Sequence, residues 1–226
     1  MINIVTASSS NHFKSLCQFL KSVPIEYNTF VYDIGLTQEE AIEVKNTFPT
    51  IKYRIFDFSL YPSFVNLSSQ DAGAYAWKPI IVSDVYKETS GVLIWCDAGN
   101  IITDVNQFNQ FPDLLNIYNI YSPYSSGLIG WMTHPKCFEV MNAEKFIIDC
   151  AMRNAACIGL KCNNSMVESF VNEWKSYALN KDAILPDGAN RSNHRHDQSI
   201  LSILFYKYRI PCIDEYLGFS IHNDIV

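Results

Sequence analysis

The chain has 226 residues, of which 48% are hydrophobic and 14% aromatic, and its formal net charge is −6. These values exclude a disordered chain and favour one globular domain with a substantial core. No run of Lys or Arg forms a basic stripe, which argues against a dedicated nucleic-acid binder. A phosphorylated ligand would therefore be held by a few local groups or by a metal.

Seven cysteines occur without CxxC spacing, and several lie inside apolar runs, which predicts reduced, buried thiols. The first residues, MINIVTASSS, contain neither a positive region nor a long apolar segment, so they predict no signal peptide. No stretch approaches the length of a membrane span. We therefore expect a soluble protein of the cytoplasm.

Strands and helices alternate through the N-terminal part of the chain. Short β-branched or alternating runs predict strands, and Asn11 and the capping-box pattern Thr37-Gln-Glu-Glu40 predict helix starts. The expected elements are strands at 2–6, 30–32 and 51–56 and helices that begin at Asn11 and Thr37, the second ending near Phe48. This spacing predicts parallel βαβ units.

The stretch from Ala76 to Asn100, AWKPIIVSDVYKETSGVLIWCDAGN, organises the chain. Its apolar run GVLIWC predicts a strand covered on both faces, and Asp97 follows where that strand ends, which is where ligands bind in open α/β sheets. Lys78 precedes Pro79 and is expected just at a helix amino terminus, where an anion such as a phosphate would compensate its charge. Asp97 also suits a plain turn, and Lys78 also suits a solvated surface position.

Further elements are predicted in the second half. We expect a short edge strand and turn at 101–108, an irregular or edge segment at 116–124, strands at 127–132 and 155–162, helices at 136–150, 164–180 and 197–208, and a polar loop at 181–195. The sequence NHRHDQ, 193–198, lies just before the last helix. It could bring His194, His196 and Asp197 to a cleft as acid, base or sugar contacts, or Asp197 could cap the helix.

Several segments, taken in their order along the chain, resemble one enzyme family. They are IVTASSSNHFKSL, FVYDIGLT, YAWKPIIVSDV, VLIWCDAGNIITDVNQF, AACIGLKCNNSMVESFVNEW and HRHDQSILSIL. Together they are similar to nucleotide-sugar glycosyltransferases of the GT-A fold, in particular to family 8-like proteins and a related group with a Trp-Lys-Pro helix start followed by a strand and Asp-Ala-Gly.

The resemblance implies an α/β fold of the GT-A, Rossmann-like type, with a mostly parallel central sheet flanked by helices. It implies one domain, 1–226, with a nucleotide-sugar-binding half at about 1–105 and an acceptor-side half at about 106–226. The implied activity is a hexosyl- or pentosyltransferase. It would move a sugar from a nucleoside diphosphate, in most such enzymes UDP, to a hydroxyl of a glycan or glycoprotein acceptor.

The resemblance also assigns roles to residues. Donor binding is implied for Thr6, Ala7, Ser8, Asp33, Lys78, Asp97, Ala98, Gly99 and Gln198. Asp197, with His196, is implied as catalytic, and Asp197 is the first choice as the base for the acceptor hydroxyl.

Position 99 departs from the family pattern. Asp97 matches the first Asp of the family's Asp-x-Asp motif, whereas Gly99 stands where the second, metal-binding Asp is found. A Mn²⁺ or Mg²⁺ ion would then be held by Asp97 with His222 or Asp224, or would be absent. Two alternatives stay open: a GT-A-like module that binds sugar nucleotides without catalysis, and a sugar-phosphate nucleotidyltransferase.

Overall fold

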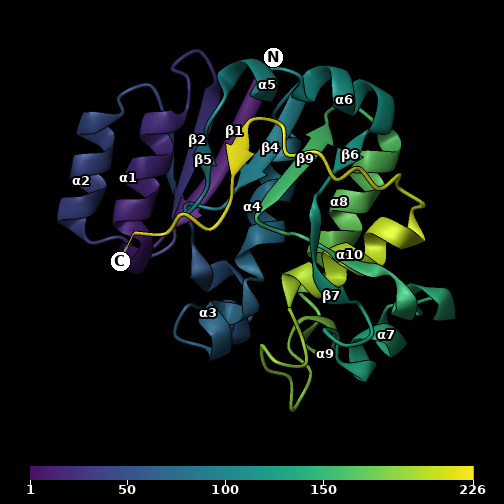
Figure 1. Cartoon of the computed structure of the whole chain (residues 1–226). Coiled ribbons are helices and arrows are strands. Elements are labelled where there is room, and N and C mark those ends of the chain that lie inside the picture. The colour runs from purple at the N-terminus through teal and green to yellow at the C-terminus, as the bar shows by residue number, and fades with distance from the viewer. Residues whose placement is uncertain (226) are drawn as a thin grey trace.

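The computed structural model describes residues 1–225. Within them, a six-stranded sheet in the order β3-β2-β1-β4-β9-β6 forms the centre of the molecule (Figure 1). Its strands are β1 (Ile2–Ser8), β2 (Asn28–Asp33), β3 (Lys52–Ile55), β4 (Val92–Cys96), β6 (Ile120–Tyr121) and β9 (Cys157–Lys161). β1 pairs in parallel with β2 and β4, and β2 pairs in parallel with β3. β9 runs antiparallel to both of its neighbours. The predicted mostly parallel α/β sheet is confirmed.

Helices cover both faces of this sheet. On one face lie α4 (Trp77–Tyr86), α8 (Ser165–Ala178) and α10 (Asp197–Lys207), and on the other α1 (Phe13–Ser22), α2 (Gln38–Thr47) and α6 (Phe111–Tyr118). Successive side chains of a strand point to opposite faces. Leu93 and Trp95 of β4 therefore pack into the first helix layer, and Ile94 and Cys96 into the second. Both faces of β4 are covered, as its unbroken apolar run predicts.

Smaller elements complete the described chain. They are α3 (Gln70–Ala74), β5 (Ile101–Ile102), α5 (Val105–Phe108), β7 (Tyr124–Leu128), α7 (Pro135–Val140), β8 (Ala151–Arg153), α9 (Lys181–Ile184) and β10 (Phe219–Ser220), with 3-10 turns at 10–12, 58–60, 63–65 and 145–149. β5 pairs with β10 and β7 with β8 in antiparallel ribbons. No helix among residues 1–225 is both long and apolar enough to cross a membrane.

Several local predictions need correction. Asn11 does not cap α1, because it lies inside a 3-10 turn and α1 begins only at Phe13. The polar loop at 181–195 contains the helix α9, whose first turn is capped by the side chain of Asn180. The strand expected at 127–132 ends at Leu128 and is followed by a turn.

The segment expected to be irregular or an edge at 116–124 begins with the last three residues of α6, and the rest contains the edge strand β6 and the start of β7. Pro112 lies in the first turn of this helix, where its missing N–H costs nothing, and Phe111 and Leu115 share its buried face. The chain becomes an edge strand only at β6. The capping box of α2 is present: Glu40 N donates to Thr37 Oγ1, and Thr37 N donates to Glu40 Oε2. The seven cysteines are all free, but only Cys96, Cys137, Cys157 and Cys162 are buried as expected, and Cys212 is exposed.

The C-terminal segment returns from α10 across the sheet to the neighbourhood of α1 (Figure 1, yellow). Asn223 N donates to Gly99 O at 2.7 Å, just after β4. Gln18 of α1 donates to Asn223 O at 3.2 Å, and Ile225 N donates to Ser15 Oγ at 2.9 Å. These contacts hold the segment over the carboxyl ends of β1 and β4.

Candidate active site

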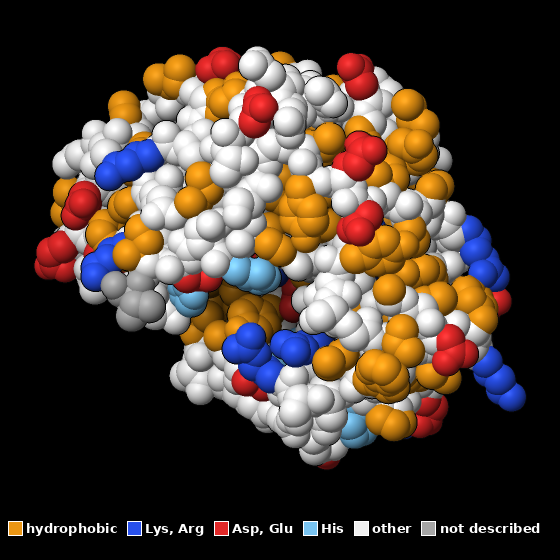
Figure 2. All heavy atoms as spheres, viewed as in Figure 1, with side chains coloured by type: hydrophobic (Ala, Val, Ile, Leu, Met, Phe, Trp, Pro, Cys, Tyr) orange, Lys and Arg blue, Asp and Glu red, His pale blue; other side chains and the backbone are white. Residues whose placement is uncertain are grey.

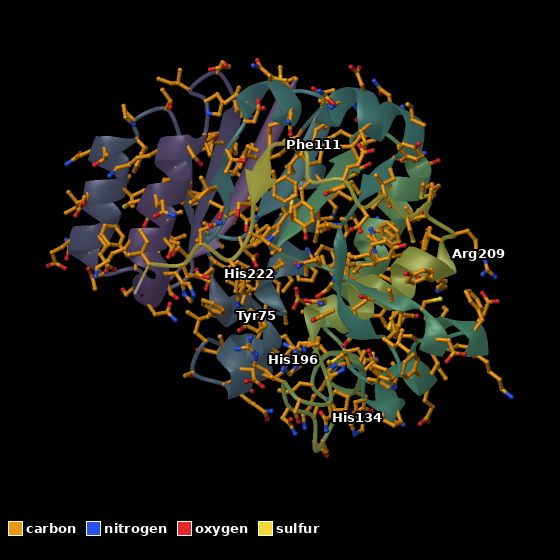
Figure 3. The ribbon with its side chains drawn as sticks, viewed as in Figure 1. Tyr75, Phe111, His134, His196, Arg209 and His222 are labelled. Carbon is orange, nitrogen blue, oxygen red and sulfur yellow. The ribbon has the colours of Figure 1, made fainter. Side chains whose placement is uncertain are left out.

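A cavity of about 440 Å³ opens at the carboxyl ends of β1 and β4. Its walls come from five regions: the end of β1, the segment around α3, the start of α4, the turn after β4, and the residues just before α10, with the C-terminal segment along its rim. Figure 3 shows Tyr75, His196 and His222 around this hollow. The volume lies in the range of small-ligand sites, and its position is where α/β sheets bind ligands.

Lys78 lies at the floor of the cavity. Lys78 is the second residue of α4, which begins at Trp77. Pro79 is tolerated as the third residue because the first turn of a helix needs no N–H donor. The anions beside Lys78 are two carboxylates of the chain itself. Its Nζ lies 2.9 Å from Asp97 Oδ1 and 3.3 Å from Asp197 Oδ2.

The Lys78 cluster is buried unevenly, with side-chain exposures of 5% for Lys78, 4% for Asp197 and 37% for Asp97. Burial alone would lower the pKa of Lys78, but the charges of Asp197 and Asp97 outweigh it and raise that pKa above its usual value. Burial also raises the pKa of Asp197, against the opposing effect of Lys78. A single cation cannot neutralise two carboxylates, so the cluster carries excess negative charge and Asp197 is the less compensated partner.

Asp97 emerges at the end of β4, as the apolar strand predicts. Its Oδ1 also accepts a hydrogen bond from Trp95 Nε1 at 2.7 Å, and its backbone N–H donates to Ala156 O at 2.9 Å. Asn100 closes the following turn, since its N–H donates to Asp97 O. The carboxylate is thus held at Oδ1 by Trp95 and Lys78, on a backbone that is itself hydrogen-bonded.

Two buried acceptor oxygens on the cavity wall have no hydrogen-bond donor among residues 1–225. They are Oδ1 of Asn100 and Oδ2 of Asp197, whose approach to Lys78 is an ion pair without hydrogen-bond geometry. Buried acceptors are normally paired. The two oxygen atoms are buried in residues that line the cavity, and unpaired acceptors beside a cavity fit a ligand that carries hydroxyl groups, such as a sugar.

The residues present do not fit a divalent metal. Asp97, His222 and Asp224 all line the cavity, but residues 1–225 contain no group of three His, Cys, Asp or Glu side chains that could hold a metal ion. Asp97 Oδ1 is already used by Trp95 and Lys78. Gly99 itself supplies no ligand, and the carboxylate beside it is that of Asp224.

The two histidines of NHRHDQ have different environments. His194 is fully buried and does not line the cavity; its Nδ1 accepts from His134 N at 3.3 Å, and its Nε2 faces Ala183 O at 3.1 Å. This pairing suits a neutral ring that donates through Nε2, and burial lowers the pKa of His194 to about 3. His194 is therefore a buried structural residue.

His196 does line the cavity. Its Nδ1 faces Ile184 O and its Nε2 faces Asp71 Oδ2, each at 3.0 Å. Both ring nitrogens already have partners, and a catalytic role for His196 stays a prediction. Asp197 is the first residue of α10 rather than its N-cap. His196 is the N-cap residue, but its side chain makes no capping hydrogen bond to the helix.

A left-handed segment forms the wall opposite α10. Residues 71–75 all have positive φ, from 48° to 71°, although four of them are not glycine. Gly73 is required there, since a Cβ would clash with the backbone of Val65. Left-handed backbone costs an L-residue about 1–2 kcal/mol. The strained turn presents Ala72 and Tyr75 to the cavity and brings Asp71 to His196.

The structure brings most of the expected site residues together. Those that line the cavity are Ala7, Ser8, Lys78, Asp97, Ala98, Gly99, His196, Asp197, Gln198 and His222. Thr6 and Asp33 do not line it. Thr6 is fully buried in β1 and directly precedes Ala7, the first residue of β1 that lines the cavity. The Asp33 carboxylate closes the turn after β2, where it accepts from Gly35 N and Leu36 N, and from Tyr53 Oη at 2.6 Å.

Sequence reasoning missed Arg191, Arg195, Tyr75, Trp95 and Asn100 as site residues. Trp95 was missed because an aromatic residue in an apolar strand is normally interpreted as part of the hydrophobic core. Arg191 and Arg195 lie in the polar loop before the last helix, and their closeness in sequence to Asp197 could have indicated a role in the site.

Comparison with known proteins gives a partial family match. A family model described as a protein of unknown function, DUF1647, matches residues 1–83. No curated protein matches the chain.

Solved structures match over nearly the whole chain. The galactosyltransferase LgtC in complex with donor and acceptor sugar analogues aligns over 97% of this chain and 86% of its own, with 14% identity and a TM-score of 0.56. Mouse xyloside xylosyltransferase 1 aligns over 94% and 84%, with 11% identity and a TM-score of 0.49. A mannosyltransferase from Pyrobaculum calidifontis, solved with GDP-Man and Mn²⁺, aligns over 82% and 52%, with 8% identity and a TM-score of 0.44. The likeness to LgtC, at 14% identity, shows the fold alone, which is that of GT-A glycosyltransferases.

Proposed function

We propose that this chain transfers a sugar from a nucleoside diphosphate sugar, UDP-linked, to a hydroxyl of a glycan or glycoprotein acceptor. The observation that carries the proposal is the cavity at the carboxyl ends of β1 and β4. Its wall combines the Lys78–Asp97–Asp197 cluster with unpaired buried acceptors. A GT-A fold with this cavity has the place and the polar groups for a sugar nucleotide.

The donor would lie along the end of β1 and the turn after β4. Ala7, Ser8 and Ser9 line that side of the cavity, and their small side chains let a nucleoside approach the backbone. Ala98 and Gly99 leave the same kind of room after β4. In this proposal residues of about 1–105 form the donor half, and the acceptor half follows from about 106.

The sugar would contact the cluster at the cavity floor. Asp97, held by Trp95 and Lys78, would accept hydrogen bonds from sugar hydroxyls. Asn100 Oδ1 offers a second buried acceptor. Gln198, half-buried on the wall, would contact the transferred sugar or the acceptor.

Asp197 would take the proton of the acceptor hydroxyl. The acceptor oxygen forms a bond to the anomeric carbon, the bond from that carbon to the diphosphate oxygen breaks with its electron pair leaving on the diphosphate, and the hydroxyl proton passes to Asp197. A raised pKa makes the ionised carboxylate a stronger base, while the adjacent Lys78 cation favours the ionised form.

Donor cleavage tests the proposal. The protein is incubated with a panel of UDP- and GDP-sugars, with and without Mn²⁺, and release of the nucleoside diphosphate is measured. Asp197→Asn should lower turnover on the order of 100-fold. The matched control is Asp84→Asn, which removes a carboxylate paired with Lys175 away from the cavity lining. If no donor is bound or cleaved under either condition, the proposal is wrong.

The poor fit to a metal favours one second candidate, a GT-A-like module that binds sugar nucleotides without catalysis. Donor binding without turnover, unaffected by Asp97→Asn, would support this alternative over the transferase.

A further inference from the structure

Lys78 cannot supply the positive charge that a diphosphate needs. An ammonium group carries three N–H donors. Three oxygen atoms already surround Nζ: Asp97 Oδ1 at 2.9 Å, Ala155 O at 3.1 Å and Asp197 Oδ2 at 3.3 Å. Two of these are carboxylates, so the Lys78 charge is already compensated. The role of Lys78 is to fix the two aspartates.

The cavity holds two further cations, Arg191 and Arg195. Figure 2 shows basic side chains along one edge of the hollow and histidines along the other. Neither guanidinium pairs with a carboxylate of residues 1–225. By contrast, Arg54 pairs with Glu88 and Arg209 pairs with Glu144. Arg153 has no carboxylate partner either, but it is fully buried and donates to the backbone oxygens of Ser122 and Ile213. Arg191 and Arg195 are thus the guanidinium groups without an anion that line the cavity.

The backbone that carries these arginines is held in place. Gln70 Nε2 donates to Ala189 O at 2.6 Å, and Asn190 N donates to Asn193 Oδ1 at 2.8 Å. Arg195 N donates to Met132 O at 3.0 Å and to Ser199 Oγ at 2.9 Å. A segment anchored along its length loses little conformational freedom when a ligand binds its side chains.

Charge balance points the same way. The cavity wall carries three carboxylates, Asp97, Asp197 and Asp224, and Lys78 compensates only part of this charge. A diphosphate would be repelled without additional cations. The described residues do not offer a site for a divalent metal, because Gly99 supplies no carboxylate and no group of three ligands is present.

We propose that Arg191 and Arg195 bind the diphosphate of the donor and take the place of a divalent cation in this site. The proposal rests on the proposed transferase function. A guanidinium donates two parallel hydrogen bonds to phosphate oxygens, which suits this role better than a point charge. When the bond to the anomeric carbon breaks, its electron pair moves to the leaving diphosphate, and the two guanidinium groups stabilise the negative charge that develops there.

Calorimetric titration tests the proposal. The full chain is titrated with UDP and with inorganic pyrophosphate, once in EDTA and once in Mn²⁺. Binding should occur in EDTA and change little with Mn²⁺. Arg191→Ala and Arg195→Ala should each weaken binding in EDTA on the order of 10- to 100-fold, as expected for loss of a hydrogen bond between charged groups. Arg191 is exposed and Arg195 half-buried, so both variants should fold.

The matched control is Arg209→Ala, which removes the same charge from a site far from the hollow (Figure 3). Binding that requires Mn²⁺, or arginine variants that bind like the wild type, would overturn this inference while leaving donor binding intact. If the wild type binds neither UDP nor pyrophosphate in either buffer, the transferase function fails and the inference with it.

Discussion

The carboxylate of Asp224 occupies the space beside Gly99. A Cβ added at position 99 would lie far inside van der Waals contact with both oxygens of that carboxylate. Asn223 N, next to Asp224, donates to Gly99 O at 2.7 Å, so the C-terminal segment is tied to the turn after β4 at this point. The missing side chain at position 99 therefore leaves room for the C-terminal segment to reach the cavity.

Gly99→Ala should couple energetically to Asp224. The new methyl group must push the Asp224 side chain aside, which we expect to lower the free energy of unfolding by about 1 kcal/mol. In an Asp224→Ala background the same substitution should cost much less, and the difference is the coupling energy measured by urea denaturation of all four proteins. Equal effects in both backgrounds would show that Asp224 does not occupy this space in solution.

Lys78→Met should strongly destabilise the fold. It leaves the buried Asp197 without a cation, and breaking a buried ion pair from one side costs about 3 kcal/mol or more. Lys78→Met combined with Asp197→Asn should recover much of this loss, because the buried charge is then gone. Thermal and urea unfolding of the three proteins checks the prediction. A double variant no more stable than the single one would mean that Lys78 acts through packing alone.

His194 should make the fold sensitive to acid. Its pKa is about 3 in the folded protein and near 6.5 when unfolded, so between these values the unfolded chain binds more protons. Stability should therefore fall as the pH drops below about 6.5, and the contribution of this group between pH 7 and pH 5 is about 2 kcal/mol.

The variant His194→Gln keeps a donor but does not titrate. Its unfolding free energy should depend less on pH than that of the wild type over this window, whatever its absolute stability. Identical pH slopes for the two proteins would contradict the assignment of His194 as a buried neutral ring.

Ala72→Gly should stabilise the protein. Ala72 has φ 53° in the left-handed segment, where glycine fits without strain. Relief of that strain, less the extra entropy that glycine loses on folding, should raise the free energy of unfolding by about 0.5–1 kcal/mol. The matched control is Ala41→Gly in α2, a right-handed helix, which should lower it by about 1 kcal/mol. Destabilisation at both positions would argue against a left-handed turn at 71–75.

The sequence by itself determined the order of strands and helices up to β4, the burial of that strand, Asp97 at its end and the capping box at Thr37. These features depend on the spacing of side chains within one element or on neighbours three residues apart, so local periodicity is enough to predict them. Local periodicity did not predict that β9 runs antiparallel to β4, because the direction of a strand depends on its connection to the sheet rather than on its own residues.

Only the tertiary structure decided how the site is assembled. Lys78 donates a hydrogen bond to Ala155 O, 77 positions along the chain, and forms an ion pair with Asp197, the first residue of α10. His194 and His196 are two residues apart and both are buried, yet only His196 lines the cavity. Such partners are chosen when helices and loops pack against the sheet, which brings distant segments to the same end of its strands. Gly99 and Asp224 are the clearest case, because the side chain that fills the space beside Gly99 comes from the C-terminal segment, far along the chain.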